Sequence, residues 1–215
     1  MHLAGGVAPD GTRLLSEESV AAMASYQSDL PDKYVLGDSW GVGWIRFGWD
    51  GQDLVGHDGN TGGQAAFLRV LPEAGLAVTL LTNGGHTRDL YEDLYREIFE
   101  ELAGVEMRAP LAPPAVPADA SITPHLGMYE RAGERLEVLA SQAGPVLRRT
   151  ELGPLAEFNP EPVTDYPMTA IAGDVWAVRE PGTVTWIPVT FYTLDCGAKF
   201  VHFGARATPK VDDAA

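Results

Sequence analysis

The chain has 215 residues, of which 45% are hydrophobic and 21% charged, and its net charge is −15. This composition is that of a soluble globular protein with one large or two small domains, and its acidity excludes nucleic acid as the expected partner. The single cysteine, Cys196, excludes an intrachain disulfide and a cysteine-based metal cluster.

The first half of the chain combines helical and strand-like patterns. Residues 14–27 predict a short helix with Ser16 as its N-cap. Strands are expected at residues 41–47, 53–57, 64–71 and 76–82. Leucine and isoleucine then recur every four residues over 87–102, which predicts an amphipathic helix packed on the sheet; the positions are Leu90, Leu94, Ile98 and Leu102.

A proline-rich segment separates this half from the next. Residues 109–118 contain four prolines, so they predict an extended linker and a domain boundary. Residues 122–211 show seven or eight strand-like runs with no helical period, which indicates a barrel or a sandwich. We therefore expect a first domain over residues 1–107, a linker over 108–121 and a second domain over 122–215.

The N-terminus and the apolar runs bear on the location of the chain. Residues 1–6 lack the basic, apolar and small-residue order of a signal peptide. No apolar run is long enough to cross a bilayer. As written, the sequence predicts a soluble, cytoplasmic chain without a membrane partner.

The stretch of the first half that most strongly suggests chemistry is Gly56–Gly63, with the sequence GHDGNTGG. Its four glycines would let the backbone approach a ligand closely and direct its N–H groups outward. From composition alone, a glycine-rich hairpin loop in which His57 only ends a strand is an equally good interpretation.

The order of these blocks resembles a known family. The segment at residues 9–23, WGVGW at 40–44, GHDGNTGG at 56–63 and the strands and helix up to residue 103 are similar to the C-terminal third of β-lactamase and D-alanyl-D-alanine-peptidase-like serine hydrolases, which include esterases. The opening of the second half, from Leu126, resembles the lipocalin-like domains that follow some of these peptidases. The resemblance implies an α+β fold, with helices flanking an antiparallel sheet, followed by an all-β lipocalin-like barrel.

The resemblance also implies roles for four residues. His57, Asp58 and Gly59 occupy the place of the family's Lys-Thr-Gly or His-x-Gly triplet. His57 would lie beside the substrate carboxylate or the proton path, and Gly59 would let the substrate lie along the strand edge. The backbone N–H of Asn60 would supply one half of the oxyanion hole. Asp58 departs from the usual small hydroxyl residue, and its carboxylate would repel an anionic substrate, which favours a neutral ester or amide.

The residues that would attack the substrate are absent. None of the three lysines has a serine three residues before it, and no tyrosine or serine has an asparagine two residues after it. The family's nucleophile block and its second block are therefore missing, and the simplest interpretation is an N-terminally truncated chain, with Met1 at a normally internal position. Gly37–Gly41 satisfies Gly-x-Ser-x-Gly, but without the strand-turn-helix setting of a nucleophile elbow Ser39 is a chance match.

Three functional hypotheses follow. In the first, the chain is part of a serine hydrolase that acts on a small-molecule or short-peptide substrate, namely a small ester, an amide or a D-amino-acid peptide, once an upstream segment or a partner chain supplies the nucleophile. In the second, it is a non-catalytic module that binds a small ligand, and in the third it is a remnant of marginal stability. We expect no cofactor and no metal, and we expect self-association through the sheet face that a missing helical layer would leave exposed.

Overall fold

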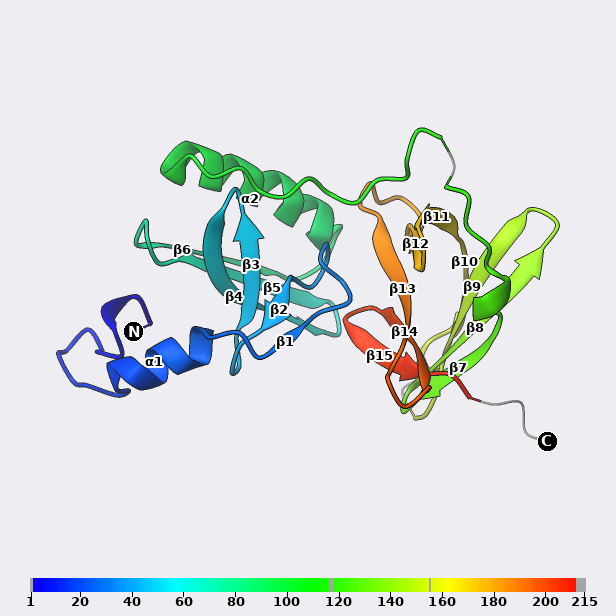
Figure 1. The fold of residues 1–215 in the computed structure, drawn as a ribbon, viewed down its shortest axis with the longest axis horizontal. Coiled ribbons are helices and arrows are strands. Elements are labelled where there is room, and N and C mark those ends of the chain that lie inside the picture. Colours follow the sequence, from blue (N-terminus) through cyan, green and yellow to red (C-terminus); the bar gives the residue numbers. More distant parts are fainter. Residues whose placement is uncertain (1, 117, 155, 212–215) are drawn as a thin grey trace. The chain divides into compact units, whose positions relative to one another are not determined.

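The computed structural model describes residues 2–116, 118–154 and 156–211. Met1 and Pro117, on which parts of the sequence predictions rest, lie outside these ranges. The chain divides into two compact units, Met1–Ala109 and Pro110–Ala215, each built on antiparallel sheets (Figure 1). No helix among the described residues is both long and apolar enough to cross a membrane.

The first unit is a six-stranded antiparallel sheet with two α-helices. The sheet order is the chain order, β1 to β6. The elements are η1 (His2–Ala4), α1 (Glu17–Ala24), β1 (Ser28–Asp29), β2 (Ser39–Trp40), β3 (Ile45–Trp49), β4 (Gln52–Thr61), β5 (Gln64–Leu71), β6 (Leu76–Thr82) and α2 (Thr87–Ala103). The expected strands at residues 64–71 and 76–82 are confirmed, whereas β4 extends well beyond the expected residues 53–57.

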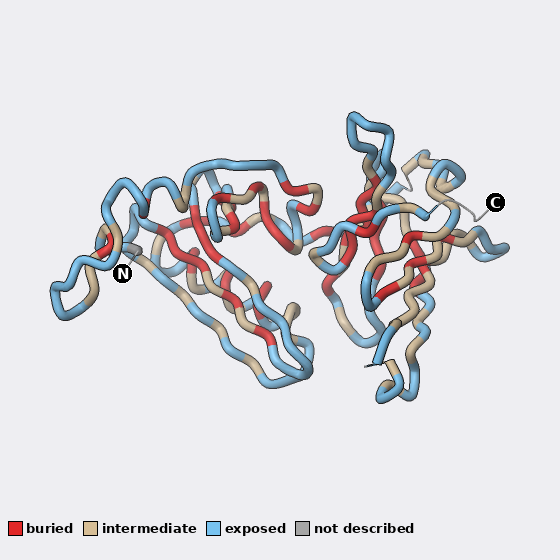
Figure 2. The backbone as a smooth tube through the Cα atoms, turned by 90° about the horizontal axis from the view of Figure 1, so that it is seen from below, coloured by how far each residue is buried: buried red, intermediate tan, exposed pale blue. Residues whose placement is uncertain are grey.

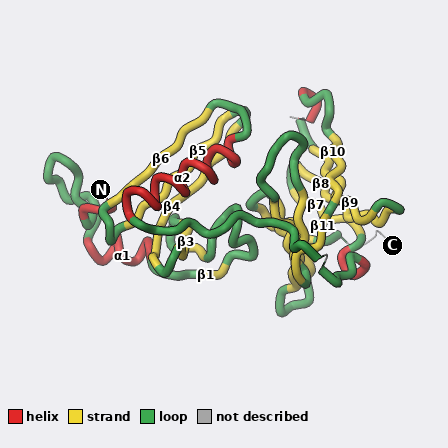
Figure 3. The backbone as a smooth tube through the Cα atoms, turned by 90° about the horizontal axis from the view of Figure 1, so that it is seen from above, coloured by secondary structure: helices red, strands yellow, loops and turns green. Residues whose placement is uncertain are grey.

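Helix α2 covers one face of this sheet (Figure 3). The ring of Phe67 on β5 stacks on Tyr91 with centroids 4.6 Å apart, and Trp49 on β3 meets Phe99 edge-on at 5.2 Å. The hydroxyl of Tyr95 donates to the carbonyl oxygen of Phe67 at 2.8 Å. These aromatic contacts bury the largest apolar groups of the unit and fix the helix against the strands.

The helix uses a different face from the one that the leucine spacing predicts. Leu90 and Leu102 are 48% and 68% exposed, while Tyr91, Tyr95 and Phe99 are at most 1% exposed. The buried stripe is therefore rotated by one position. The aromatic residues bury more area than leucine, and the buried hydroxyl of Tyr95 donates to carbonyl oxygens of the sheet.

The opposite side of β6 is open to solvent. Ala77 and Thr79 are exposed, and Leu81 is 74% exposed. β6 is also the last strand of the sheet, so one row of its backbone groups has no neighbouring strand in the described chain. Natural edge strands use charged residues and prolines to prevent pairing with another strand. The sequence of β6, LAVTLLT, contains neither.

We therefore expect Leu81→Lys to reduce concentration-dependent self-association of the chain, because a charge on an open edge strand opposes strand pairing. Sedimentation velocity over a range of concentrations measures this effect. Leu102→Lys, at a similarly exposed leucine on α2, is the matched control. If the wild-type chain remains monomeric, or if both variants behave alike, the expectation about β6 is wrong.

The second unit is a pair of antiparallel sheets. One has the order β10-β9-β8-β7 and the other β11-β12-β13-β14-β15. The elements are η2 (Thr123–His125), β7 (Gly127–Arg131), β8 (Glu134–Ser141), β9 (Gly144–Glu151), η3 (Ala156–Phe158), β10 (Val163–Pro167), β11 (Thr169–Ala172), β12 (Val175–Val178), β13 (Ile187–Thr193), β14 (Lys199–Phe203) and β15 (Arg206–Pro209).

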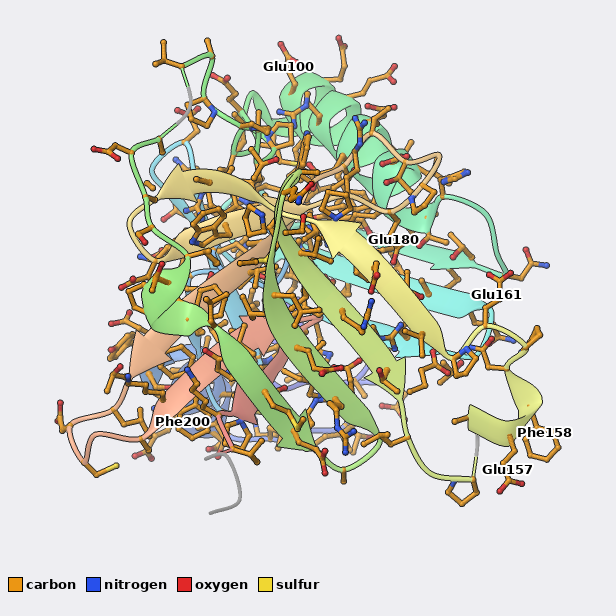
Figure 4. The ribbon with its side chains drawn as sticks, turned by 90° about the vertical axis from the view of Figure 1, so that its right-hand side faces the viewer. Glu100, Glu157, Phe158, Glu161, Glu180 and Phe200 are labelled. Atoms are coloured by element: carbon orange, nitrogen blue, oxygen red, sulfur yellow. The ribbon has the colours of Figure 1, made fainter. Side chains whose placement is uncertain are left out.

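The two sheets of this unit enclose one apolar core. Its buried members come from both sheets and include Tyr129, Leu136, Trp176 and Phe191. Buried backbone segments are grouped inside each unit, and the turns are exposed (Figure 2). Phe158 on η3 is an exception among the aromatic residues described in this unit, since it is 83% exposed and projects from the surface beside Glu157 (Figure 4).

The predicted fold class is wrong in both halves. The described chain is mostly β, with three antiparallel sheets and only two α-helices, and α1 buries a single side chain, Val20, so it cannot form a layer. The second unit shows no closed barrel among its described residues, because consecutive strands β10 and β11 do not pair. Pro167 ends β10 without an N–H group, and Met168 donates instead to Pro145 at 2.9 Å as the chain passes between sheets.

His125 links η2 to the core of the second unit. Its ring stacks on Phe191 at 4.1 Å, and its Nε2 lies 3.1 Å from Asp174. Burial lowers the pKa of His125, Asp174 raises it, and Lys210 and Lys199 lower it, with a net fall from the ordinary value of 6.5. The folded state therefore favours the neutral imidazole.

The second unit should lose stability as the pH falls. In the unfolded chain His125 binds a proton near pH 6.5, and in the folded chain it does so only at a lower pH. The contribution of His125 to the free energy of unfolding is therefore fully present above pH 6.5, and it is lost as the pH falls from 6.5 through the lower pKa of the folded state. Urea unfolding at pH 7.5 and pH 5, read from second-unit peptides by hydrogen exchange, should show a smaller pH effect in His125→Gln than in wild type. His86→Gln, in the first unit, is the control; equal pH effects in wild type and His125→Gln would refute this role.

Candidate active site

The Gly56–Gly63 stretch is mainly a strand rather than a loop. Residues 56–61 belong to β4, and only Gly62 and Gly63 form the turn to β5. Thr61 is paired with Gln64 across this two-residue turn, and Gly63 has a φ of +75°, which suits glycine. The stretch therefore has a defined register.

That register leaves one edge of β4 open. β3 pairs with β4 only as far as Ile45 opposite Gly56, whereas β5 pairs with β4 as far as Thr61. Backbone groups of successive residues point to alternate sides of a strand. The hairpin turns at residues 50–51 and 62–63 direct Gln52, Leu54 and Gly56 toward β3, and His57, Gly59 and Thr61 toward β5. The backbone N–H and C=O groups of Asp58 and Asn60 consequently face the open edge.

Gly56 has a packing requirement of its own. A β-carbon at this position would lie 2.0 Å from the carbonyl oxygen of Leu68 and 3.2 Å from Cδ of Arg69. At Gly59, in contrast, an added β-carbon would meet only Cβ of Ala66, at 3.9 Å. The neighbouring strands therefore require a glycine at Gly56 but not at Gly59, where its absent side chain leaves free space above the strand.

His57 is exposed and lies at the open edge. Its Nδ1 is 2.7 Å from the carbonyl oxygen of Asp58, and its ring is 6.0 Å from that of Trp40, at the end of β2. Because the carbonyl oxygen can only accept, Nδ1 carries the proton of this hydrogen bond. The imidazole is thus held between the strand backbone and an indole ring.

The Asp58 side chain points away from the edge, toward the α2 side of the sheet. Its oxygens accept from Nη1 of Arg69 at 2.5 Å and from Nη2 at 3.1 Å, and Nη1 of Arg88 lies 3.6 Å away. The argument that Asp58 would repel an anionic substrate assumes a free carboxylate. Two guanidinium groups neutralise it, so that argument fails.

Arg69 is completely buried beneath this strand. Its guanidinium carbon lies 3.8 Å from the centre of the Phe47 ring and 5.0 Å from that of Tyr91. Burial lowers the pKa of Arg69, but Tyr91 and Asp58 outweigh this effect and the pKa is raised. Burial raises the pKa of Tyr91 to about 12, so its phenol remains protonated beside the arginine.

A second row of charges on α2 surrounds this pair. Glu92 lies 3.3 Å from Arg88 and 3.6 Å from Arg96. Burial raises the pKa of Glu92, and the two arginines lower it in part. The sequence predictions assign no role to Arg69, Arg88 or Glu92. The one signal in the sequence was Arg69 itself, an arginine inside the apolar run AAFLRVL.

Ser39 does not lie in the geometry of a nucleophile elbow. It begins the short strand β2, is 5% exposed, and is followed by β3 rather than by a helix. Its hydroxyl lies 3.4 Å from Nη1 of Arg46. The interpretation of the Gly-x-Ser-x-Gly match as coincidental therefore agrees with its setting.

Comparison with known proteins places the first unit in a family context. Residues 1–103 match the family model described as Beta-lactamase. Penicillin-binding protein 4 of Amycolatopsis lactamdurans is 47% identical over 134 residues, which make up 62% of this chain and 35% of that protein. Two solved structures of SurE, one of them with D-Leu, are 30% and 29% identical, with TM-scores of 0.65 and 0.63; the matches cover 92% of this chain and 43% and 44% of SurE. The chain spans less than half the length of these relatives.

Proposed function

We propose that this chain, whose residues 1–103 match the Beta-lactamase family model, supplies the substrate-binding strand and one oxyanion donor of a serine hydrolase. The observation that carries the proposal is the open edge of β4, where the backbone N–H and C=O groups of Asp58 and Asn60 have no partner strand within the described part of the chain. An extended substrate can lie along such an edge and form main-chain hydrogen bonds with it.

Within this proposal, the backbone N–H of Asn60 is the oxyanion donor. A donor held by a strand keeps its direction while negative charge develops on the substrate oxygen, so no reorganisation is needed during the reaction. Gly59 leaves room for the substrate above the strand, and His57 lies beside the reacting group. The substrates are small esters, amides or D-amino-acid peptides, and the SurE structure with D-Leu supports the last class.

The nucleophile comes from outside these 215 residues in this proposal. No serine or other hydroxyl residue precedes a lysine by three positions in the sequence, so the usual activation of a hydroxyl by an amine one helical turn away has no candidate here. By itself the chain is therefore a binding component without hydrolytic activity.

A chimera tests the proposal. The part of Penicillin-binding protein 4 that precedes its aligned segment is joined to the start of this chain, and hydrolysis of nitrophenyl esters, D-leucyl p-nitroanilide and nitrocefin is measured for the chimera and for the chain alone. We expect turnover only in the chimera, and a fall in kcat/KM of about 10²–10⁴-fold for His57→Ala if His57 assists proton transfer. A folded chimera without turnover of any of these substrates would count against the hydrolase proposal.

A non-catalytic role is the second candidate, and the missing nucleophile favours it. In that case the same edge of β4 would bind a short peptide without cleaving it. Titration of the labelled chain with D-leucinamide and N-acetyl-D-leucine distinguishes the two, because the binding module gives saturable shifts at Asp58 and Asn60 while its chimera remains inactive.

A further inference from the structure

Asp58 makes two contacts that point in different directions. Its carboxylate binds the buried guanidinium of Arg69 on the α2 side of the sheet, and its main-chain carbonyl oxygen accepts from the His57 ring at the open edge. One residue thus joins the buried charges beneath β4 to the exposed imidazole.

The carboxylate end of this connection is rigid. Arg69 has no exposed surface, it binds Asp58 through two nitrogens, and its Nη1 also donates to the carbonyl oxygen of Leu68 at 2.8 Å. A planar guanidinium with two bonds to one carboxylate fixes the orientation as well as the position of its partner. The Asp58 backbone is consequently held with its carbonyl toward His57.

The carbonyl end determines the state of the imidazole. In a neutral histidine one ring nitrogen is a donor and the other an acceptor, and the hydrogen bond made by one sets the role of the other. Nδ1 of His57 donates to Asp58, so Nε2 carries the lone pair.

We infer that Asp58, anchored by Arg69, is a positioning residue that holds His57 as the Nδ1–H tautomer. Nε2 is then a hydrogen-bond acceptor at the open edge, and at neutral charge it selects a hydroxyl, amide N–H or ammonium group of the ligand over a carboxylate. This assignment of the His57 tautomer deepens the proposed function. Its consequence for substrate choice rests on that proposed function.

Long-range proton–nitrogen correlation spectra of the full 15N-labelled chain at pH 8.5 test the inference, with the His57 signals assigned by their loss in His57→Gln. We expect a protonated Nδ1 and an unprotonated Nε2 in wild type. In Asp58→Leu/Arg69→Met, which removes both charges together, both nitrogen shifts should move toward their average. Asp58→Asn, which keeps an oxygen for Arg69, should restore the wild-type shifts.

Arg148→Met/Asp165→Leu removes another two-point Arg–Asp pair, in the second unit, and is the matched control with no expected change. A wild-type spectrum with protonated Nε2, or an unchanged tautomer in a folded double variant, overturns the inference. If the double variant does not fold, Arg69→Lys gives the answer: partial averaging supports the positioning role, and unchanged shifts reject it. A fixed Nδ1–H tautomer together with an inactive chimera would reject the hydrolase proposal and leave the positioning role standing.

Discussion

Asp58→Leu is expected to lower the free energy of unfolding of the first unit by about 3–5 kcal/mol, because it leaves a buried arginine without its counter-charge. Arg69 has no exposed surface, and its charge cannot be removed by deprotonation at any ordinary pH. Arg88 would then add to the uncompensated positive charge, since it also lies near the Asp58 carboxylate. Urea unfolding followed by hydrogen exchange in peptides from β4 and β5 measures the loss, with second-unit peptides as the internal control.

The double variant Asp58→Leu/Arg69→Met separates the cost of the unpaired charge from the value of the pair. Replacing both charges by apolar side chains of similar size is often neutral or stabilising, so the double variant should recover most of the lost stability. A single variant within about 0.5 kcal/mol of wild type would show that solvent reaches Arg69, contrary to its burial.

The sequence predicts the strands of the first unit better than it predicts which side chains of α2 pack against them. The apolar runs at residues 64–71 and 76–82 define β5 and β6 to the residue, because a half-buried strand has a clear pattern between turn residues. Helix α2 is also predicted, but its packed face is not. The leucines and the aromatic residues both recur at helical spacing here, so the sequence offers two possible buried faces. The sheet favours the aromatic face, because its carbonyl groups lie within reach of the Tyr95 hydroxyl.

The candidate site shows a similar limit. The glycine-rich stretch draws attention from sequence, and its four proposed residues remain predictions about function. The Asp58 side chain faces Arg69 rather than a ligand because side chains alternate between the two faces of β4. The hairpin turns on both sides of the strand set this alternation. The expected loop hides this alternation, because a loop has no defined faces. The barrel prediction fails for a related reason: the number of strands does not determine whether the sheet edges pair with one another, and β10 and β11 do not.

In the active chimera, Asn60→Pro is expected to reduce kcat/KM by about 10²–10³-fold, the usual cost of losing one oxyanion donor. Proline has no N–H group, and at the open edge this removes no bond of the β4–β5 ladder, so the fold should tolerate the change. Asn60→Ala keeps the N–H and should retain nearly full activity. Gly59→Pro, one residue earlier, removes a group that faces β5 and should unfold the strand instead. Equal activity of the proline and alanine variants at position 60 would mean that the oxyanion is bound elsewhere, and the role assigned to the edge of β4 would then be limited to holding the substrate backbone.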